Sequence, residues 1–482
     1  MKRKKINMKA NPNPKANRHI LMLTYGVVLL FVGLGVYFGY FLLFRSDSVI
    51  NNSYNARLDS FADRVVRGEI YSSDGRVLAK TEVDGEGKET RVYPYDSLFA
   101  HVVGYSTNGK TGLEALSNFY LLTSHVNLIE QVVNEWSGLK NPGDSVFSTL
   151  DVDLQKAAFD ALGKRKGAVV VMEPDTGKIL AMVSKPDYNP NTLAADWSNL
   201  VAEDNNSGQL LNRATQGLYP PGSTFKLVTA LEYMRENPAN YRDYIFDCNG
   251  IYKNADYTIR CYHETAHGHQ NLEQAFANSC NGAFSNLGLQ LNLNKWKNTA
   301  DQLLFNTDLP LPIAGNKSSY SMEYGADTWE ILQTAIGQGQ TQITPIHNAM
   351  IVAAIANGGT LMKPYLIDHV ENAGGDVIKK FLPQSYGNLM TAVEASDLTE
   401  FMGAVVRSGT GSALRTDAYT VAGKTGSAEF EKGKETHAWF IGFAPAEQPR
   451  VVISVIAEES GSGGQTAAPI ARTLFDLYFS RQ

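Results

Sequence analysis

The sequence contains few cysteines, no internal repeat and no long low-complexity tract. Only 3 of its 482 residues are cysteine (Cys248, Cys261 and Cys280), and such an odd, low number excludes a scaffold held together mainly by disulfides. Cys248 and Cys261 are close enough in the sequence to close a short loop as a disulfide, or they remain free thiols. A third interpretation is a zinc site that also uses nearby histidines, namely His263, His267 and His269. Because neither C-x-x-C nor H-E-x-x-H is present, we expect no metal site.

Long uncharged runs are also absent, with one exception near the N-terminus. In residues 20–44, 25 consecutive residues carry no charge, whereas a bilayer requires about 20. The run ends FLLFR without an A-x-A-like cleavage site, and it is longer than the roughly 7–15 apolar residues of a signal peptide. We therefore expect an uncleaved, single-pass transmembrane anchor over residues 20–44.

Acidic residues are absent before residue 20, where seven basic residues stand: Lys2, Arg3, Lys4, Lys5, Lys9, Lys15 and Arg18. The positive-inside rule then predicts a basic cytoplasmic tail at residues 1–19 and places the remaining chain on the far side of the cell membrane. Subtracting these seven from the 43 basic residues leaves 36 against 49 acidic ones, a net charge near −13. This charge excludes a general affinity for nucleic acid, and the predicted topology places the substrate outside the cytoplasm.

Residues 45–150 have the pattern of a small mixed domain next to the membrane. RGEIYSSDGRVLAKT predicts two strands joined by an Asp-Gly turn. HVVGYS predicts a further strand, and TGLEALSNFYLLTS predicts a helix. The Pro-Gly turn in KNPGDSVFSTLD marks the end of this domain near residue 150.

Residues 151–482 predict an α+β domain in which helices cover one antiparallel sheet. Asp151 is placed to cap a helix over LQKAAFDALGK, and GAVVVMEPDTGKILAMVS predicts a β-hairpin. Near the end, DAYTVAGKTGSAEF, THAWFIGFAP and RVVISVIAEE predict three strands. The final segment GQTAAPIARTLFDLYF predicts an amphipathic helix that lies on the sheet.

The stretch LYPPGSTFKLVTA places Ser223 three residues before Lys226, whose neighbours are apolar. Residues three apart share one face of a helix, so both side chains point the same way if a helix begins near Gly222. Apolar surroundings lower the pKa of a lysine, and a neutral amine next to a hydroxyl is a general base for a serine nucleophile. The helix N-terminus adds backbone N–H donors for an oxyanion.

S-x-x-K alone is a common pattern, and the segment Ser137-Gly-Leu-Lys140 matches it too. The copy at Ser223 is followed by Ser279-Cys-Asn281 and then by Lys424-Thr-Gly426. S-x-x-K, S-x-N and K-T-G in this order form the motif set of the penicillin-recognising serine enzymes. Earlier matches to the last two motifs, within residues 106–112, have the wrong order and are too close together to form opposite walls of a cleft.

With these motifs, the chain resembles the class B penicillin-binding proteins, which are monofunctional peptidoglycan transpeptidases. RGEIYSSDGRVLA is similar to the family's R-G-x-I-x-x-x-x-G-x-x-L-A, and HVVGYSTNGKTGLEALSNFYL to its Gly-x-Gly-Leu-Glu segment. STLDVDLQKAA, IGQGQTQITPIHNAM, and GKTGSAEF followed by HAWFIGFAP are similar to the transpeptidase domain. The likeness covers nearly everything after the anchor. It implies a pedestal domain at residues 45–150 and a penicillin-binding, β-lactamase-like fold at residues 151–482.

The resemblance implies a serine acyl-transfer reaction. Ser223 would attack a D-Ala-D-Ala stem peptide, expel the terminal D-alanine and form an acyl-enzyme, with Lys226 as its base. Ser279 would relay a proton to or from the leaving amine, and Asn281 would hold the substrate amide. β-lactams would acylate Ser223 covalently, and no cofactor takes part.

The resemblance also assigns roles around the K-T-G motif. Lys424 would supply positive charge to the cleft, and Thr425 would offer its hydroxyl to the substrate carboxylate. Gly426 has no Cβ, so substrate can lie against this segment as an added strand. The oxyanion hole would use the backbone N–H groups of Ser223 and Ser427. Ser427 stands where threonine is more frequent, which a main-chain contact tolerates.

Alternative functions share this chemistry. A D,D-carboxypeptidase would differ only in using water as the acceptor. A β-lactam sensor or β-lactamase would share the motifs, but a class A lactamase needs a deacylating glutamate, and the segment around Glu323 lacks E-x-x-L-N. The roughly 105 residues before Asp151 are too few for a glycosyltransferase domain. The resemblance therefore implies a separate glycan-polymerising membrane protein as partner.

Overall fold

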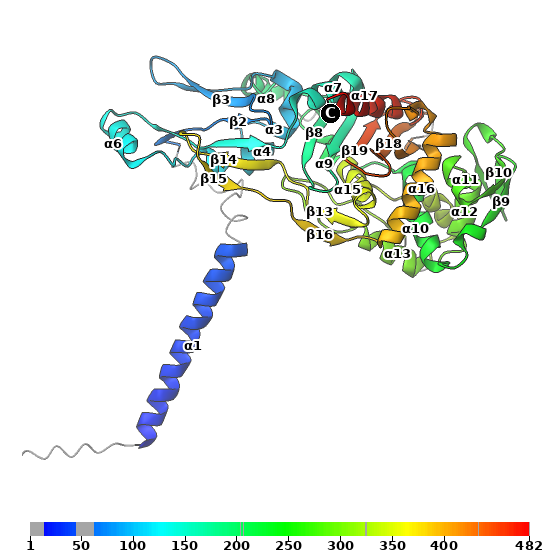
Figure 1. The fold of residues 1–482 in the computed structure, drawn as a ribbon, viewed down its shortest axis with the longest axis horizontal. Coiled ribbons are helices and arrows are strands. Elements are labelled where there is room, and N and C mark those ends of the chain that lie inside the picture. Colours follow the sequence, from blue (N-terminus) through cyan, green and yellow to red (C-terminus); the bar gives the residue numbers. More distant parts are fainter. Residues whose placement is uncertain are drawn as a thin grey trace, which may run out of the picture. The chain divides into compact units, whose positions relative to one another are not determined.

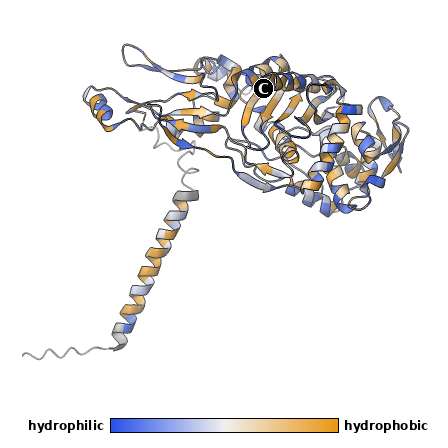
Figure 2. Ribbon diagram, in the orientation of Figure 1, coloured by the Kyte–Doolittle hydropathy of each residue, from blue (hydrophilic) through white to orange (hydrophobic). Residues whose placement is uncertain are grey.

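The computed structural model describes residues 14–44, 62–202, 204–205, 207–322, 325–431 and 433–481, in two units, Met1–Ala56 and Arg57–Gln482. The first unit contains helix α1 (Pro14–Phe44), which is largely apolar along its length (Figure 1 and Figure 2). Its segment Arg18–Phe41 has 24 residues, or about 36 Å at 1.5 Å per residue, against a hydrocarbon core of about 30 Å. This length and composition suffice to cross a membrane, which confirms the predicted N-terminal apolar helix.

Six strands form the first sheet of the larger unit, in the order β15 (Val377–Lys380), β14 (Ile367–Glu371), β6 (Ser145–Ser148), β2 (Ile70–Tyr71), β3 (Val77–Val83) and β4 (Glu89–Val92). Ile70 lies opposite Ala79 in the antiparallel β2–β3 pair and opposite Val146 in the parallel β2–β6 pair. The two strands and Asp-Gly turn predicted in RGEIYSSDGRVLAKT are therefore present. β14 and β15 come from far beyond residue 150, so this sheet joins distant parts of the chain.

The segment HVVGYS, for which a strand is predicted, contains no strand, and its first three residues are helical. Helix α3 (Ala100–Val103) follows the 3₁₀ turn η2 (Asp96–Phe99), and all four of its residues are buried. A short apolar run that is buried on every side has no periodicity to distinguish a helix from a strand, and the sequence prediction was wrong here for that reason. The helix predicted in TGLEALSNFYLLTS is present as α4 (Gly112–Leu116) and α5 (Asn118–Leu121).

Glu114 on α4 connects these helices to the six-stranded sheet. Its fully buried carboxylate accepts hydrogen bonds from Arg67 Nε and Arg91 Nε, both at 2.7 Å. Burial by itself raises the pKa of Glu114, but the two guanidinium groups outweigh it and lower the pKa to about 2. Arg67 begins RGEI and Glu114 ends TGLE, so the two family-like segments of the N-terminal region meet at this ion cluster.

The second sheet has five antiparallel strands in the order β17 (Ala422–Ala428), β18 (His437–Ala444), β19 (Val451–Ala457), β7 (Gly167–Met172) and β8 (Ile179–Lys185). Along β7, Val170 and Met172 join one apolar cluster, whereas Val169 and Val171 join another on the opposite face. Because both faces are covered, the strand sequences are nearly continuous apolar runs. The predicted α+β class, the hairpin β7–β8 and the three C-terminal strands are confirmed.

Helices cover both faces of the five-stranded sheet (Figure 1). Helices α7 (Val152–Leu162) and α17 (Ala467–Ser480) pack on one face, and α15 (Pro345–Ala356) packs on the other. The Asp151 side chain accepts a hydrogen bond from the Leu154 backbone N–H at 2.8 Å, so it caps α7 as the sequence predicts. α17 is the predicted C-terminal amphipathic helix.

The remaining elements complete the larger unit. The helices are α6 (Leu128–Trp136), α8 (Leu193–Leu200), α9 (Arg213–Gln216), α10 (Lys226–Glu236), α11 (Leu272–Ala277), α12 (Asn281–Gly288), α13 (Leu293–Gln302), α14 (Thr328–Ala335) and α16 (Ala392–Ser408). The 3₁₀ turns are η3 (Gly222–Phe225), η4 (Tyr241–Asp243), η5 (Tyr262–Glu264) and η6 (Ser412–Leu414). Short strands pair as β1 (Val65–Val66) with β5 (Asn141–Pro142), β9 (Ile245–Cys248) with β12 (Gly268–Asn271), β10 (Ile251–Asn254) with β11 (Tyr257–Arg260), and β13 (Thr360–Met362) with β16 (Ser385–Asn388).

Candidate active site

A cleft of about 510 Å³ lies beside β17 of the five-stranded sheet. All three sequence motifs contribute to its lining, through Ser223, Ser279, Asn281, Thr425, Gly426 and Ser427. Lys226 and Lys424 have no exposed surface and hydrogen-bond to the residues of this lining. Successive motifs are 56 and 145 residues apart, so only the tertiary fold brings them together.

Ser223 lies in the 3₁₀ turn η3, directly before α10. Gly222 precedes it with φ +53°, a left-handed conformation that glycine adopts without a steric penalty. The indole Nε1 of Trp439 donates a hydrogen bond to the Pro220 carbonyl at 3.1 Å and holds the start of the turn. Among the described residues the half-buried Ser223 hydroxyl has no hydrogen-bond partner, so it is available to a substrate.

The amine of Lys226 lies between the two polar residues of the S-x-N motif. Its Nζ donates to the Ser279 carbonyl and to Asn281 Oδ1, both at 2.7 Å, and lies 3.2 Å from Ser279 Oγ. Burial lowers the pKa of Lys226 to about 8, against the opposing effect of the Cys280 and Cys261 thiols. An amine with this pKa accepts a proton near neutral pH, as a general base must.

Ser279 occupies the turn between α11 and α12. Its φ of +54° is uncommon for a residue other than glycine, so the surrounding contacts hold it in this conformation. The Ser279 hydroxyl accepts a hydrogen bond from Lys424 Nζ at 2.9 Å while it faces Lys226 Nζ on its other side. It therefore bridges the two lysines and is suited to pass a proton between groups in the cleft.

Neither Lys226 nor Lys424 forms an ion pair with a carboxylate within the part of the chain that the structure describes. Burial lowers the pKa of Lys424 well below its ordinary value, and the charge of Lys226 lowers it further. Two ammonium groups that share one hydroxyl disfavour each other. The arrangement therefore favours states in which at least one of the two amines is neutral.

β17 is an edge strand that carries the K-T-G motif. It pairs with β18 on one side and has no strand partner on the other within the described residues. The Thr425 hydroxyl lies 2.6 Å from the Thr410 hydroxyl. A β-carbon on Gly426 would lie 3.1 Å from side-chain carbons of both Thr224 and Trp439, so the glycine also permits close packing. A free strand edge beside a cleft can accept an extended peptide as an added strand.

Sequence reasoning missed several residues that complete the cleft. Thr410 lies in SGTGS, and Ser462 and Gln465 lie in SGSGGQ. These turns carry no catalytic motif, but their glycine- and serine-rich composition was an available signal, because loops held by a rigid scaffold often supply binding residues. Arg260 contributes from the end of β11, where no sequence signal is present.

The earlier motif matches do not line this cleft. Residues 106–112 lead into α4, where Thr111 is the N-cap residue and Gly112 has φ +55°. Ser137 follows the last residue of α6. These segments therefore belong to local turns of the N-terminal region. Glu323, the glutamate in the segment that lacks E-x-x-L-N, lies outside the described residues.

Two family domains match the chain. Residues 167–476 match the penicillin-binding protein transpeptidase domain, and residues 67–146 match the penicillin-binding protein A dimerisation domain. The peptidoglycan D,D-transpeptidase PbpA of Mycolicibacterium smegmatis is 32% identical over 89% of this chain and 92% of the relative. The peptidoglycan D,D-transpeptidase MrdA of Acinetobacter baumannii is 31% identical over 82% of this chain and 66% of the relative.

Solved structures resemble the larger unit closely. The D,D-transpeptidase domain of a peptidoglycan glycosyltransferase from Eggerthella lenta has a TM-score of 0.78 and 33% identity, covering 87% of this chain and 99% of that structure. Penicillin-binding protein A from M. tuberculosis, as its ceftriaxone acyl-enzyme complex, has a TM-score of 0.78 and 31% identity with the same coverage.

Proposed function

The chain belongs to the class B penicillin-binding proteins, and on that basis we propose that it is a membrane-anchored serine D,D-transpeptidase that cross-links peptidoglycan stem peptides. One observation carries the proposal: the Ser279 hydroxyl lies 3.2 Å from Lys226 Nζ and 2.9 Å from Lys424 Nζ, in the cleft that Ser223 lines. This contact joins the three motifs into one catalytic unit.

In acylation, the Ser223 hydroxyl attacks the carbonyl carbon of the D-Ala-D-Ala bond and gives its proton to neutral Lys226. The backbone N–H groups of Ser223 and Ser427 stabilise the negative charge that develops on the carbonyl oxygen. As the C–N bond breaks, the departing D-alanine amine takes a proton relayed from Lys226 through the Ser279 hydroxyl. The product is an ester between the stem peptide and Ser223.

The walls of the cleft hold the donor peptide. Asn281 binds the amide of the residue before the scissile bond, and the peptide extends along the free edge of β17 as an added strand. Thr425 donates its hydroxyl to the terminal carboxylate, with Thr410 as its neighbour at 2.6 Å. Lys424 adds positive potential and holds Ser279 in position.

In deacylation the protons move in the opposite direction, and the attacking amine comes from a second stem peptide. The amine of a neighbouring stem peptide attacks the ester carbonyl and gives its proton to Lys226 or Ser279, and the Ser223 oxygen leaves and regains a proton. A β-lactam follows only the first half, because its leaving amine stays attached. Among the described residues that line the cleft, the exposed Glu429 is the one acidic residue, and it does not contact Lys226. The described lining therefore offers no carboxylate beside Lys226 that could activate a deacylating water.

Labelling with a fluorescent penicillin tests the assignment of the nucleophile. Membranes that contain the full chain should show one covalent band, and Ser223→Ala should abolish it. Ser137→Ala removes the serine of the other S-x-x-K match and should label like the wild type. An unlabelled wild type, or a labelled Ser223→Ala variant, would contradict the proposal.

Product analysis separates transpeptidase from carboxypeptidase. The purified full chain is given donor stem peptides with and without an acceptor amine, and the products are identified by mass spectrometry. We expect a cross-linked dimer and one D-alanine released per bond formed. Release of D-alanine without dimer at saturating acceptor would assign the carboxypeptidase instead.

We also propose a topology and a division into domains. Residues 1–19 form a cytoplasmic tail, residues 20–44 the anchor, residues 45–150 the pedestal and residues 151–482 the transpeptidase domain outside the membrane. The seven cations before residue 20 support this orientation. Protease added to intact spheroplasts should digest the catalytic domain but leave an epitope at the N-terminus protected. The reverse pattern would contradict the topology.

A glycan-polymerising membrane protein is the partner that the family resemblance implies. Helix α6 supports a partner, because its apolar side chains are exposed: Leu128, Ile129, Val132, Val133 and Trp136. The wild type should co-purify with an activity that polymerises a lipid-linked glycan precursor, and Trp136→Glu should lose it while penicillin labelling is retained. Co-purification that Trp136→Glu leaves unchanged would remove α6 from the interface.

A further inference from the structure

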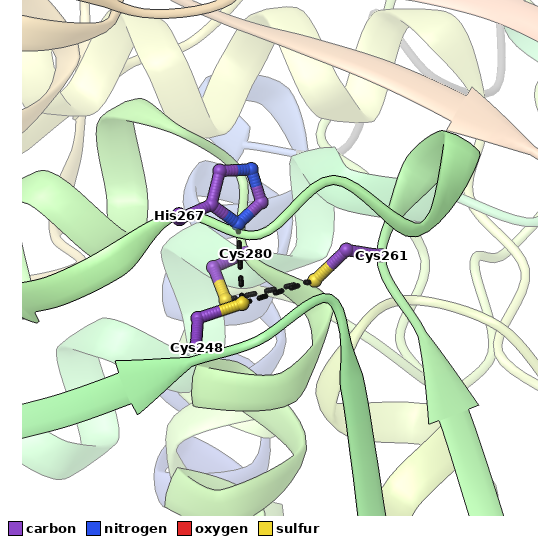
Figure 3. Close-up of side chains that lie close together, drawn as sticks. All are labelled: Cys248, Cys261, His267 and Cys280. Carbon is purple, nitrogen blue, oxygen red and sulfur yellow. Dashed lines mark hydrogen bonds between the residues drawn. The ribbon is translucent and has the colours of Figure 1, made fainter.

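All three cysteines of the chain converge on one histidine next to the active site. The sulfur atoms of Cys248, Cys261 and Cys280 face the ring of His267 (Figure 3). Cys248 Sγ lies 3.7 Å from Cys261 Sγ and 3.4 Å from His267 Nδ1, and Cys261 Sγ lies 3.7 Å from Cys280 Sγ. The four potential ligand atoms all lie within 4.8 Å of one another.

Three of the six separations among these atoms correspond to edges of a tetrahedron around a metal ion. A zinc ion binds thiolate sulfur at about 2.3 Å and imidazole nitrogen at about 2.0–2.1 Å. Tetrahedral angles then place two sulfur ligands about 3.8 Å apart, and a sulfur and a nitrogen about 3.5 Å apart. The observed contacts of 3.7, 3.7 and 3.4 Å match these edges closely.

The cysteines are not joined as disulfides. All three are free, and the Cys248–Cys261 and Cys261–Cys280 Sγ–Sγ separations, both 3.7 Å, far exceed a bond of about 2.05 Å. Backbone N–H groups point at two of the sulfurs: Gly250 donates to Cys248 Sγ and Ala283 to Cys280 Sγ, both at 3.4 Å. Such hydrogen bonds stabilise metal-bound thiolates and orient them.

The structure separates His267 from the two other histidines considered in the sequence. His269 is exposed, and its Nδ1 lies 2.8 Å from Asp247 Oδ1 instead. The ring of His263 is exposed and contacts Tyr262. Only His267 directs a ring nitrogen toward the three sulfurs, because it directly precedes β12, which pairs with the strand that ends at Cys248.

We propose that Cys248, Cys261, His267 and Cys280 bind one structural zinc ion. Three thiolates and one imidazole are a ligand set typical of structural zinc, and four protein ligands leave no open position for a substrate. The ligands come from four separate segments: the end of β9, the residue after β11, the residue before β12 and the N-cap of α12. One ion would therefore cross-link a region built from short two-stranded pairs.

The proposed ion has a specific consequence for catalysis. Cys280 is the middle residue of the S-x-N motif, so a metal bound to its sulfur fixes the turn that presents Ser279 and Asn281. Ser279 is held at φ +54°, a conformation that needs support from its surroundings. Cys261 and His267 also line the cleft, so the zinc ion would supply that support as part of the cleft wall, with all four of its coordination positions taken by protein.

Metal analysis of the full chain tests the site directly. The protein is purified in detergent without chelator, and its metals are measured by plasma mass spectrometry. We expect about one zinc per chain, and X-ray absorption should show three sulfurs near 2.3 Å and one nitrogen near 2.0–2.1 Å. A chain that holds less than about a tenth of an equivalent, before and after incubation with Zn²⁺, would overturn the proposal. Stoichiometric iron or copper, or a disulfide among the cysteines, would overturn it as well.

A pair of histidine variants distinguishes the loss of a metal ligand from a nonspecific effect of substitution on the fold. His267→Ala should lose zinc, whereas His269→Ala, two residues away and exposed, should keep one zinc per chain. Cys280→Ser retains an S-x-N sequence and should also lose zinc. Loss of zinc by His269→Ala but not by His267→Ala would assign a different site.

Penicillin labelling then links the ion to the cleft. Removing zinc with a chelator should slow acylation by up to about 100-fold, because displacing a catalytic group by about 1 Å costs that much, and returning Zn²⁺ should restore it. The amount of protein labelled at saturation should stay constant if the fold survives. An acylation rate that is unchanged in protein shown to be zinc-free would contradict the coupling of the ion to the S-x-N turn.

Discussion

Two regions of the chain bury ionisable side chains, and they differ in whether an oppositely charged partner is present. In the N-terminal region, Glu114 is enclosed by Arg67 and Arg91, each of which donates to its carboxylate at 2.7 Å. In the cleft, Lys226 and Lys424 are equally buried but have only neutral hydrogen-bond partners. The ring centroids of Phe284 and Phe276 lie 5.4 and 5.5 Å from their respective amines. In the first cluster a buried carboxylate has opposite charges beside it. In the second, two buried amines have none.

This difference separates a structural from a chemical use of burial. A buried carboxylate between two guanidinium groups stays ionised and holds its neighbours together. A buried lysine without a carboxylate has a lowered pKa and exchanges its proton readily. We therefore expect disruption of the first cluster to change stability, and disruption of the second to change reactivity.

The largest effect is expected at Lys226. Lys226→Met keeps the length and packing of the side chain but removes the base, so acylation should slow by about 10²–10⁴-fold. The urea midpoint should change less than in Glu114→Gln, because no ion pair is broken and the acceptors that lose the amine belong to Ser279 and Asn281, which line the cleft. Stopped-flow measurement of fluorescent penicillin binding gives the rate. Lys295→Met, an exposed lysine on α13, is the control and should react like the wild type.

Glu114→Gln should lower stability and leave the acylation rate unchanged, the reverse of Lys226→Met. It leaves two buried guanidinium groups without a counter-charge and should lower the free energy of unfolding by about 3–5 kcal/mol. Urea unfolding of the full chain measures this change, and the folded fraction should still be acylated at the wild-type rate. Glu82→Gln, which breaks the partly exposed pair with Lys80, should leave the urea midpoint unchanged. An equal loss in both variants would remove the distinction between buried and exposed pairs.

The pH dependence of acylation should follow Lys226. Burial lowers its pKa to about 8, and the titratable groups that face it are Lys424, Cys261 and Cys280. Below pH 8 the amine is increasingly protonated and cannot act as a base, so the rate should fall about tenfold for each pH unit below that value. The acylation rate constant, measured between about pH 6 and 9, should therefore rise and level off near pH 8. A flat profile over this range would exclude Lys226 as the base.

The smallest effect is expected at Ser427. If its role is to donate a backbone N–H to the oxyanion, Ser427→Thr should change the acylation rate by less than about threefold, because the main chain is unaltered. Its hydroxyl accepts a hydrogen bond from the Gly463 N–H at 3.3 Å, which threonine can also accept. A tenfold or larger change, in the same stopped-flow measurement, would give the side chain a role of its own.

Much of the fold was predictable because the local signals were strong. The apolar run at residues 20–44 is long enough to span a bilayer, Asp151 stands directly before a helical pattern, and the strands of the five-stranded sheet are apolar runs bounded by turn residues. HVVGYS was predicted wrongly, because a short segment that is buried on all sides carries no such pattern. The joining of β14 and β15 to strands from before residue 150 was not predictable either, because strand pairing between distant segments leaves no local mark.

The sequence by itself determined the order of S-x-x-K, S-x-N and K-T-G, and with it the family and the reaction class. Only the tertiary structure decided how those residues meet: that Ser279 contacts both lysines, and that Lys226 is buried without a counter-charge. The same holds for the cysteines. Their spacing matched no zinc motif, because the four ligands lie on segments that approach one another only when β9 pairs with β12 and α12 begins at Cys280. Contacts between distant segments depend on the packing of the whole domain, which local sequence does not encode.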